Sequence, residues 1–244
     1  MNASPHPGWQ ERTIQLIGET GCKKLASARV LVAGLGGVGA MAAEMLCRAG
    51  VGHLTIADGD TIQPGNLNRQ LPAKHSTIGR KKADVTGETL MDINPGLDMV
   101  IINSYIRDDG MEDILSGHFD YVVDAIDTLS PKTSLIYHAM KRGLKLVSSM
   151  GSGGKTDPSL IRIADISESF NCRLAYLLRK KLRKLGIERG FKVVFSTEPV
   201  DKKVIIPVED ELNKKSTAGT ISYIPAMFGC MMASAVVRDL VDGC

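Results

Sequence analysis

The fold of this chain is decided by Val30-Leu31-Val32-Ala33-Gly34-Leu35-Gly36-Gly37-Val38-Gly39. Its apolar first half is typical of a buried strand, and a helical pattern follows from residue 40 to residue 49. A strand, a glycine loop and a helix in this order are the context of a nucleotide-binding fingerprint. The glycines permit a tight turn and let backbone N–H groups approach phosphate oxygens at the positive end of the helix. The stretch therefore predicts an α/β fold with a nucleotide site, but it does not identify the nucleotide.

A carboxylate follows the glycine loop at the spacing that a ribose site requires. The next apolar run ends at Asp58, about 20 residues past the loop, where a carboxylate can accept hydrogen bonds from ribose hydroxyls. The alternative is a glycine turn that only packs a helix on a strand. The strand–loop–helix context and Asp58 together favour the nucleotide site.

The composition indicates one globular domain in a reducing compartment. The chain has 244 residues with 43% apolar residues, and its five cysteines form no C-x-x-C pair. This pattern argues against a structural zinc site and a disulfide framework, and it predicts a cytoplasmic protein. The longest nearly apolar run, residues 223–237, is short for a membrane span, so we expect a buried helix there and no stable membrane insertion. We expect a flexible N-terminal arm, residues 1–11, and a single domain from 12 to 244.

Apolar runs and helical patterns alternate up to about residue 150, which indicates a doubly wound, mostly parallel Rossmann-like sheet. The expected strands are 28–33, 53–58, 99–102, 121–127 and 145–149. The expected helices are 13–25, with breaks at Gly18 and Gly21, one from 38, 79–93, 111–115, one capped by Ser130, 173–185 and 222–241. Short strands at 160–163, 192–196 and 204–206 should extend the sheet in antiparallel fashion, and 207–219 should be a mobile loop.

Two polar features follow expected strands. The long connection 59–79 contains Asn66-Leu67-Asn68-Arg69-Gln70, and its internal apolar residues favour a docked functional loop over a disordered one. The strand at 121–127 ends in Asp127. Because ligands of open α/β sheets bind at the carboxyl ends of the strands, Asp127 is well placed for a site.

Five motifs occur in an order that resembles the ubiquitin-activating-enzyme-like superfamily, which includes the bacterial enzymes that adenylate sulfur-carrier proteins. They are Gly34-x-Gly36-Gly37-x-Gly39, Asp58-Gly59-Asp60, Asn66 to Gln70, Gly79-Arg80-Lys81-Lys82 and Asp124-Ala125-Ile126-Asp127. Within this superfamily the rest of the chain is most similar to the tRNA threonylcarbamoyladenosine dehydratases. The segments that carry this likeness include Arg12-Thr13, Pro131-Lys132, Gly151 to Pro158, Phe195 to Glu198 and the basic helix.

The resemblance implies an ATP-dependent adenylating domain with an assigned set of residues. The implied ATP-binding residues are Gly34, Gly36, Gly37, Gly39, Asp58, Asp60, Asn66, Arg69, Gln70, Lys82 and Asp127. The implied catalytic residues are Arg12, Arg69, Lys82 and Asp127, and Asp127 would also bind Mg²⁺, which prefers one or two carboxylates plus phosphate oxygens.

Each assignment has a plainer alternative. Arg69 could be a surface charge, Lys82 a solvated helix residue and Asp127 a helix cap. Their ordered company favours function for all three. Arg12 aligns with an arginine that family members supply from the partner subunit to the γ-phosphate, which would imply a homodimer, and for Arg12 both interpretations stay open. Cys172 and Cys230 have no general base placed beside them, so no cysteine is assigned to catalysis.

Residues 173–192 concentrate positive charge, with eight Lys and Arg against one Glu. Because the formal net charge of the whole chain is only +3, the remainder is net negative. Such a helix suits a phosphate backbone, although a charge run is usually a solvated face and its leucines indicate one packed side. The candidate tRNA-binding residues are Arg179, Lys180, Lys181, Arg183 and Lys184. Few aromatic residues accompany them in the sequence, so base stacking is not predicted.

The leading hypothesis is an enzyme that adenylates the carboxylate of threonylcarbamoyladenosine in tRNA with Mg²⁺ and ATP and closes it to the cyclic form. The second hypothesis is adenylation of the C-terminal glycine of a ubiquitin-like sulfur-carrier protein, which would use the same ATP residues. The basic helix and the missing zinc cysteines argue against it. A non-catalytic dinucleotide-binding protein is a third hypothesis, and it would leave Arg69 and Lys82 without a role. A sulfur-transfer protein is a further candidate partner.

Overall fold

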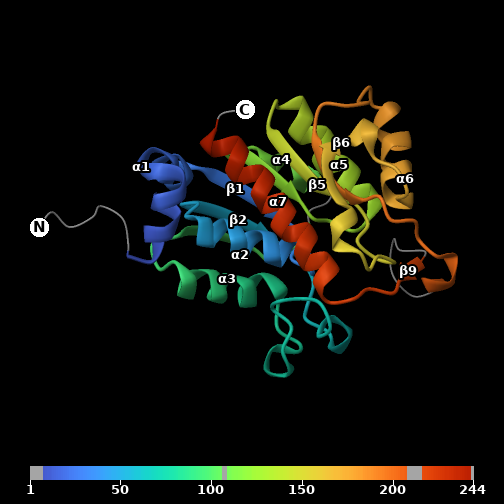
Figure 1. Cartoon of the computed structure of the whole chain (residues 1–244), viewed down its shortest axis with the longest axis horizontal. Coiled ribbons are helices and arrows are strands. Elements are labelled where there is room, and N and C mark those ends of the chain that lie inside the picture. Colours follow the sequence, from blue (N-terminus) through green and yellow to red (C-terminus); the bar gives the residue numbers. More distant parts are fainter. Residues whose placement is uncertain (1–7, 106–108, 208–215, 243–244) are drawn as a thin grey trace, which may run out of the picture.

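The computed structural model describes residues 8–105, 109–207 and 216–242 of the chain. Its centre is a seven-stranded sheet in the order β3-β2-β1-β4-β5-β7-β6 (Figure 1). These strands are β1 (Arg29–Ala33), β2 (His53–Ala57), β3 (Asp98–Ile102), β4 (Tyr121–Asp124), β5 (Lys145–Ser149), β6 (Ile161–Asp165) and β7 (Lys192–Ser196). All neighbours are parallel except β6, which runs antiparallel to β7 at one edge. The prediction of a doubly wound, mostly parallel sheet with antiparallel additions is confirmed.

Helices cover both faces of this sheet, and each face buries its own core. The helices are α1 (Glu11–Ser27), α2 (Gly39–Ala49), α3 (Lys82–Ile93), α4 (Asp109–Leu115), α5 (Leu129–Lys141), α6 (Arg173–Arg183) and α7 (Tyr223–Val241). One core contains Leu25 of α1, Leu46 of α2, Leu90 of α3 and Phe228 of α7. The other contains Met111 of α4, Ile136 of α5 and Leu178 of α6. In Figure 1, α7 crosses one face of the sheet with α2 beside it.

Among the described residues, α7 is the one helix that is long and apolar enough to cross a membrane, and half of its apolar window is buried inside the protein. Its burial depends on close contact with α2, because a Cβ on Gly229 would lie 2.5 Å from the carbonyl oxygen of Val38. Packing inside the fold thus accounts for the buried half of this apolar window.

Several predicted boundaries differ from the structure. The fourth strand ends at Asp124 and not at Asp127, because the Asp124 carboxylate accepts from the backbone N–H of Ile126 and so turns the chain there. Helix α5 then begins at Leu129 with Thr128 as its N-cap, so Ser130 lies inside the first turn and is not the cap. Helix α3 begins at Lys82 because Gly79, with φ +85°, belongs to the turn before it.

The chain ends and one long connection also differ from expectation. The expected flexible arm extends over residues 1–11, but Gly8–Gln10 already form a 3-10 helix and Gln10 is buried, while residues 1–7 lie outside the described part. The strand expected at 204–206 is present as β8 (Ile205–Pro207), but it pairs antiparallel with β9 (Ser216–Ala218) in a separate two-stranded sheet and does not extend the main one. Strand β9 lies where a mobile loop was expected. The rest of that loop, 208–215, also lies outside the described residues. The predicted break at Gly18 in α1 is present, but the one predicted at Gly21 is wrong, because Gly21 is buried within the helix with helical dihedrals.

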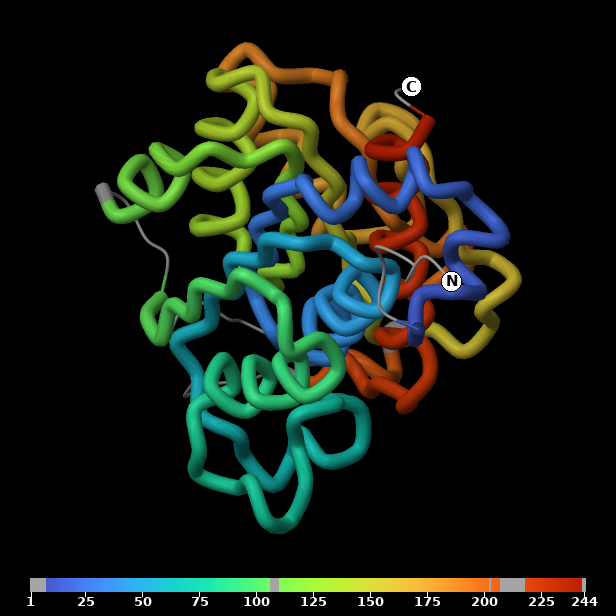
Figure 2. The backbone as a smooth tube through the Cα atoms, turned by 90° about the vertical axis from the view of Figure 1, so that its left-hand side faces the viewer, coloured from blue at the N-terminus to red at the C-terminus, as the bar shows by residue number. Residues whose placement is uncertain are grey.

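The register of the sheet brings the carboxyl ends of its central strands together. Ala33 at the end of β1 lies beside Ala57 of β2 on one side and Asp124 of β4 on the other. The glycine loop, the 59–81 connection and the loop after β4 therefore start from one edge. Figures 1 and 2 both show the 59–81 connection projecting from the fold near the start of α7.

Candidate functional site

Close packing within the fold explains three glycines of the loop, and at one of them, Gly37, a Cβ would lie 2.9 Å from the carbonyl oxygen of Arg69. Gly34 has φ +88°, and a Cβ there would lie 2.8 Å from the carbonyl oxygen of Ala125. A Cβ on Gly39 would lie 1.7 Å from the carbonyl oxygen of Gly34, so α2 can begin this close to β1 only with glycine. These two positions are explained by packing of the helix and the strand.

At Gly36 the residues that the structure describes give no steric reason for glycine. The nearest atom to a Cβ at Gly36 would be Nε2 of Gln70, at 3.8 Å, which is ordinary van der Waals contact. Gln70 itself is only 8% exposed, and its Oε1 atom has no hydrogen-bond partner among the described residues. A buried polar atom without a partner is uncommon in folded proteins. The open space above Gly36 and this oxygen together indicate a ligand position at the start of α2.

Asp58 holds the loop in place from the next strand. Its Oδ2 atom accepts from the backbone N–H of Leu35 at 2.6 Å, and Oδ1 accepts from that of Asp60 at 2.8 Å. Burial raises the pKa of Asp58, against the opposite effects of Lys82 and the two N–H groups. Each carboxylate oxygen retains a lone pair for a further donor, so the predicted contact with ribose hydroxyls is compatible with this geometry.

Lys82 is a buried cation and not a solvated helix residue. It is 6% exposed, and its Nζ atom lies 2.7 Å from Oδ2 of Asp60. The hydroxyl of Tyr105 donates to the other oxygen of Asp60 at 2.5 Å. A positive charge in the first turn of a helix opposes the helix dipole, which makes this an unfavourable position for a lysine without a specific task. Tyr105 was missed from the sequence because it lies 45 residues from Asp60.

Arg69 lies half-buried in the 59–81 connection, and its hydrogen-bond partners in the described part of the chain are neutral. Its Nη1 atom donates to the carbonyl oxygen of Gly65 and to Oδ1 of Asn68, both at 2.8 Å. The described residues place no acidic side chain within salt-bridge distance of it. Its charge is therefore oriented by the loop but not neutralised by it. The amide of Asn68 also donates to the carbonyl oxygen of Thr220 at 3.0 Å, which ties this connection to the segment before α7.

Asn66 has a structural contact of its own in the same connection. Its Oδ1 atom accepts from the backbone N–H of Gln63 at 2.9 Å and so caps the 3-10 helix Pro64–Asn66. The side-chain amide nitrogen remains as a donor toward the site.

Asp127 is exposed on the loop that follows β4, and a buried ion pair holds that loop from below. Asp124 and Lys132 are both 0% exposed, with Nζ of Lys132 2.7 Å from Oδ2 of Asp124. Ser148 Oγ donates to the same oxygen at 2.6 Å. Lys132 also donates to the carbonyl oxygen of Ile126 at 2.8 Å, while Asp124 accepts from the N–H of Ile126 at 3.1 Å. The N–H and the carbonyl oxygen of Ile126, the residue before Asp127, are thus both held by hydrogen bonds. Sequence reasoning noted Asp124 and Lys132 as motif residues but did not pair them.

Arg12 is not brought to this site within one chain. It is exposed near the start of α1, and its neighbour Gln10 packs against Gly50 just past the C-terminal end of α2. The glycine loop lies at the other end of α2, so Arg12 could reach such a site only in another copy of the chain.

The candidate tRNA-binding residues on α6 separate into two groups. Lys180, Lys181, Arg183 and Lys184 are exposed. Arg179 is half-buried, and its guanidinium donates to the backbone oxygen and the hydroxyl of Ser169. Because its guanidinium is bound to Ser169, Arg179 is less available to a phosphate than the four exposed cations. Cys172 serves as the N-cap of α6, since its Sγ atom accepts from the N–H of Ala175 at 3.5 Å.

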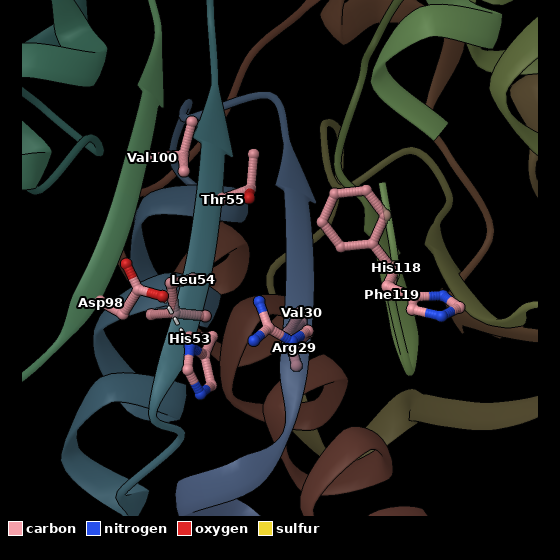
Figure 3. Close-up of a pocket in the computed structure, with 9 residues that line it drawn as sticks. All are labelled: Arg29, Val30, His53, Leu54, Thr55, Asp98, Val100, His118 and Phe119. Atoms are coloured by element: carbon pink, nitrogen blue, oxygen red, sulfur yellow. Dashed lines mark hydrogen bonds and ion pairs between the residues drawn. The ribbon is translucent and has the colours of Figure 1, made fainter. Parts of the chain in front are cut away.

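A small hollow of about 50 Å³ lies away from this edge (Figure 3). Arg29, His53 and Asp98, at the amino-terminal ends of β1, β2 and β3, contribute to its lining, and Nδ1 of His53 lies 2.7 Å from Oδ2 of Asp98. It is too small for a nucleotide and lies at the wrong ends of the strands.

The family model for the ThiF family matches residues 10–243, which is nearly the whole chain. This chain belongs to the ThiF family. A tRNA threonylcarbamoyladenosine dehydratase of Bacillus subtilis is 38% identical over 232 residues, covering 92% of this chain and 91% of that protein. A crystal structure of the Escherichia coli tRNA N6-threonylcarbamoyladenosine dehydratase with ATP has a TM-score of 0.89 at 30% identity, over 99% of this chain and 98% of that one.

A carrier-activating relative is similar over a shorter part. The molybdopterin-synthase adenylyltransferase of Salmonella typhimurium is 39% identical over 115 residues, which is 47% of this chain and 46% of that protein. The family resemblance inferred from the ordered motifs is therefore confirmed, and the likeness to the dehydratases extends over about twice as much of the chain.

Proposed function

We propose that this protein is an ATP-dependent tRNA threonylcarbamoyladenosine dehydratase. The single observation that carries the proposal is similarity to proteins of that name over nearly the full length of both chains, 92% and 91% for the Bacillus subtilis relative. The ATP complex of the Escherichia coli relative supports ATP as the co-substrate. The half-buried Arg69 and the buried Lys82 near the glycine loop supply the positive charge that a triphosphate requires.

The chemistry converts a poor leaving group into a good one. A carboxylate resists attack because oxide would have to leave, whereas an acyl-adenylate releases AMP. In the proposed reaction a carboxylate oxygen of the nucleoside attacks the α-phosphorus of ATP and pyrophosphate departs. A second group of the same nucleoside then attacks the acyl carbon and displaces AMP, which keeps the carboxylate oxygen. The nucleoside thereby loses the elements of one water and becomes cyclic.

The protein would contribute positioning and charge stabilisation. Arg69 and Lys82 would bind phosphate oxygens and stabilise the negative charge that develops on departing pyrophosphate. Asp58 would hold the ribose, and Gly36 would let the backbone approach the phosphates. Asp60, Asn66 and Gln70 complete the proposed ATP contacts. The ion pair between Lys82 and Asp60 keeps this cation oriented before a nucleotide binds.

Asp127 fits a magnesium ion that is held jointly with the nucleotide. No group of three or more His, Cys, Asp or Glu that could hold a metal occurs among the described residues, so the chain offers no complete cage. Mg²⁺ in nucleotide sites uses one or two carboxylates, water and phosphate oxygens, and an exposed Asp127 suits that arrangement. When bound, the ion would neutralise charge on the phosphates.

Arg12 provides the reason to propose a homodimer. It is exposed and remote from the site of its own chain, so a contact with the γ-phosphate would require a second copy. A sulfur-transfer partner and a cytoplasmic location stay predictions.

The molecule whose carboxylate accepts the adenylate group distinguishes this function from activation of a carrier protein. ATP–pyrophosphate exchange should require tRNA that contains threonylcarbamoyladenosine, because only that molecule presents the carboxylate. The control is the same tRNA transcribed without modification, which should give no exchange. Exchange driven by a ubiquitin-like carrier protein in the absence of tRNA would instead establish the second function.

A further inference from the structure

The outward face of α6 carries cations that have no acidic partner among the described residues. Arg173, Lys180, Lys181, Arg183 and Lys184 are exposed, and the described residues place no carboxylate within salt-bridge distance of any of them. The opposite side of the helix is fixed, because Ala175, Leu178 and Leu182 are buried in the core beneath it. The helix therefore holds its charges toward solvent, where a polyanion can replace their counterions.

An aromatic side chain lies within this charged face. Tyr176 is 58% exposed, so its ring is accessible to a ligand. Residues three, four and seven positions apart share one side of a helix, so Arg173, Lys180 and Arg183 are its neighbours. Phe170, just before the helix, is 51% exposed and makes an edge contact with Phe195 at 5.6 Å between ring centroids. The structure thus adds two aromatic rings that the sequence pattern did not associate with the basic helix.

This face begins at the same edge of the sheet as the candidate site. The Sγ atom of Cys172 accepts from the N–H of Gly151, the second residue after β5, at 3.4 Å. The ammonium group of Lys155 donates to the carbonyl oxygen of Asn171 at 3.3 Å. Strand β5 is the neighbour of β4, whose following loop carries Asp127. In Figure 1, α6 lies on the outer side of α5, and Leu178 of α6 and Ile136 of α5 share one core.

We propose that Tyr176, together with Phe170, stacks on unpaired bases of the RNA substrate while the cations of α6 bind the neighbouring phosphates. Aromatic rings interleaved with basic side chains are the arrangement that holds single-stranded nucleic acid, because every base has a face to stack on. Bases inside a duplex are already stacked, and side chains on a convex helix cannot reach those faces. The preferred ligand is therefore a single-stranded or looped RNA segment. The inference rests on the proposed function only in taking tRNA as the natural source of that segment.

The test measures RNA binding by fluorescence anisotropy for the full-length protein. The probes are a single-stranded RNA of about ten nucleotides and the same sequence as a duplex, titrated at several salt concentrations. Tyr176→Ala should weaken binding of the single strand by about 5- to 150-fold and leave the slope of log affinity against log salt unchanged. Tyr176→Phe, which keeps the ring, should bind like the unmodified protein. Met91→Ala, at an exposed position of α3, is the matched surface control.

The charged neighbours should respond differently. Changing Lys180 and Lys181 together to Ala should reduce the salt slope by about 1.4, since each phosphate contact on a single strand contributes about 0.7. Unchanged affinity in Tyr176→Ala, equal loss in Tyr176→Phe, or a preference for the duplex would overturn the stacking role. A dehydratase assay on modified tRNA separates the two proposals. Dehydration by the unmodified protein with no effect of Tyr176→Ala refutes only the stacking. Tyr176-dependent RNA binding without any dehydration refutes only the proposed function.

Discussion

The buried pair of Lys132 and Asp124 gives the sharpest stability prediction. Replacing Lys132 with Met removes the charged partner of a carboxylate that is 0% exposed and leaves it with only Ser148 Oγ and the N–H of Ile126 as donors. Breaking a fully buried pair in this way costs about 3–5 kcal/mol of the free energy of unfolding, because an uncompensated charge stays buried. With a urea m-value of about 3 kcal/mol/M, the midpoint of unfolding should fall by roughly 1–1.7 M.

A second variant separates the charge effect from lost packing. Asp124→Asn combined with Lys132→Met removes both charges and keeps an oxygen acceptor for Ser148, so it should regain at least half of the lost stability. Lys141→Met, at an exposed position of the same helix, should change stability by about 0.5 kcal/mol or less. A loss below about 1 kcal/mol for Lys132→Met, or a double variant no more stable than the single one, would refute the reasoning.

Three further predictions concern the site itself. Asp127→Ala should abolish ATP–pyrophosphate exchange while leaving the urea midpoint nearly unchanged, because this carboxylate is exposed; full exchange activity would disprove its assignment. Gly36→Ala should keep the stability of the fold but weaken ATP binding, measured by calorimetry. Gly34→Ala should instead destabilise the protein through its φ of +88° and the contact with Ala125. Equal stability loss in both variants would contradict the distinction. Burial raises the pKa of Asp58, so the stability that this carboxyl group contributes should be full below the ordinary carboxyl range and be lost as pH rises through the raised pKa. In urea unfolding at stepped pH, Asp58→Asn should lack this decline. Identical pH profiles for the two proteins would show that the shift is absent.

Local patterns predicted the central part of the molecule. The strand, the glycine loop and the helix from Val30 to Ala49 follow from apolar periodicity and glycine positions, which are properties of neighbouring residues. The carboxyl-edge position of Asp58 follows from the same rules, because parallel strands align their ends. The ordered motifs then identified the family.

The remaining features depend on contacts between distant residues. The sequence marks Lys132 as a motif residue, but only the fold reveals that its ammonium group lies against Asp124 and Ile126. Arg179 is one cation in a basic run, and its contact with Ser169 distinguishes it from its neighbours. Tyr105, which follows β3, donates to Asp60, which follows the neighbouring strand β2. Periodicity reports which face a side chain occupies but not which partner it meets, so these pairings could not be read from the sequence.

The central claim is that a carboxylate of the tRNA nucleoside is activated as an adenylate. The most direct measurement uses tRNA whose threonylcarbamoyladenosine carries heavy oxygen in the carboxylate, incubated with this protein, Mg²⁺ and ATP and analysed by mass spectrometry. The account predicts labelled AMP and a nucleoside lighter by one labelled water. Unlabelled AMP, or label recovered in inorganic phosphate together with ADP, would contradict it.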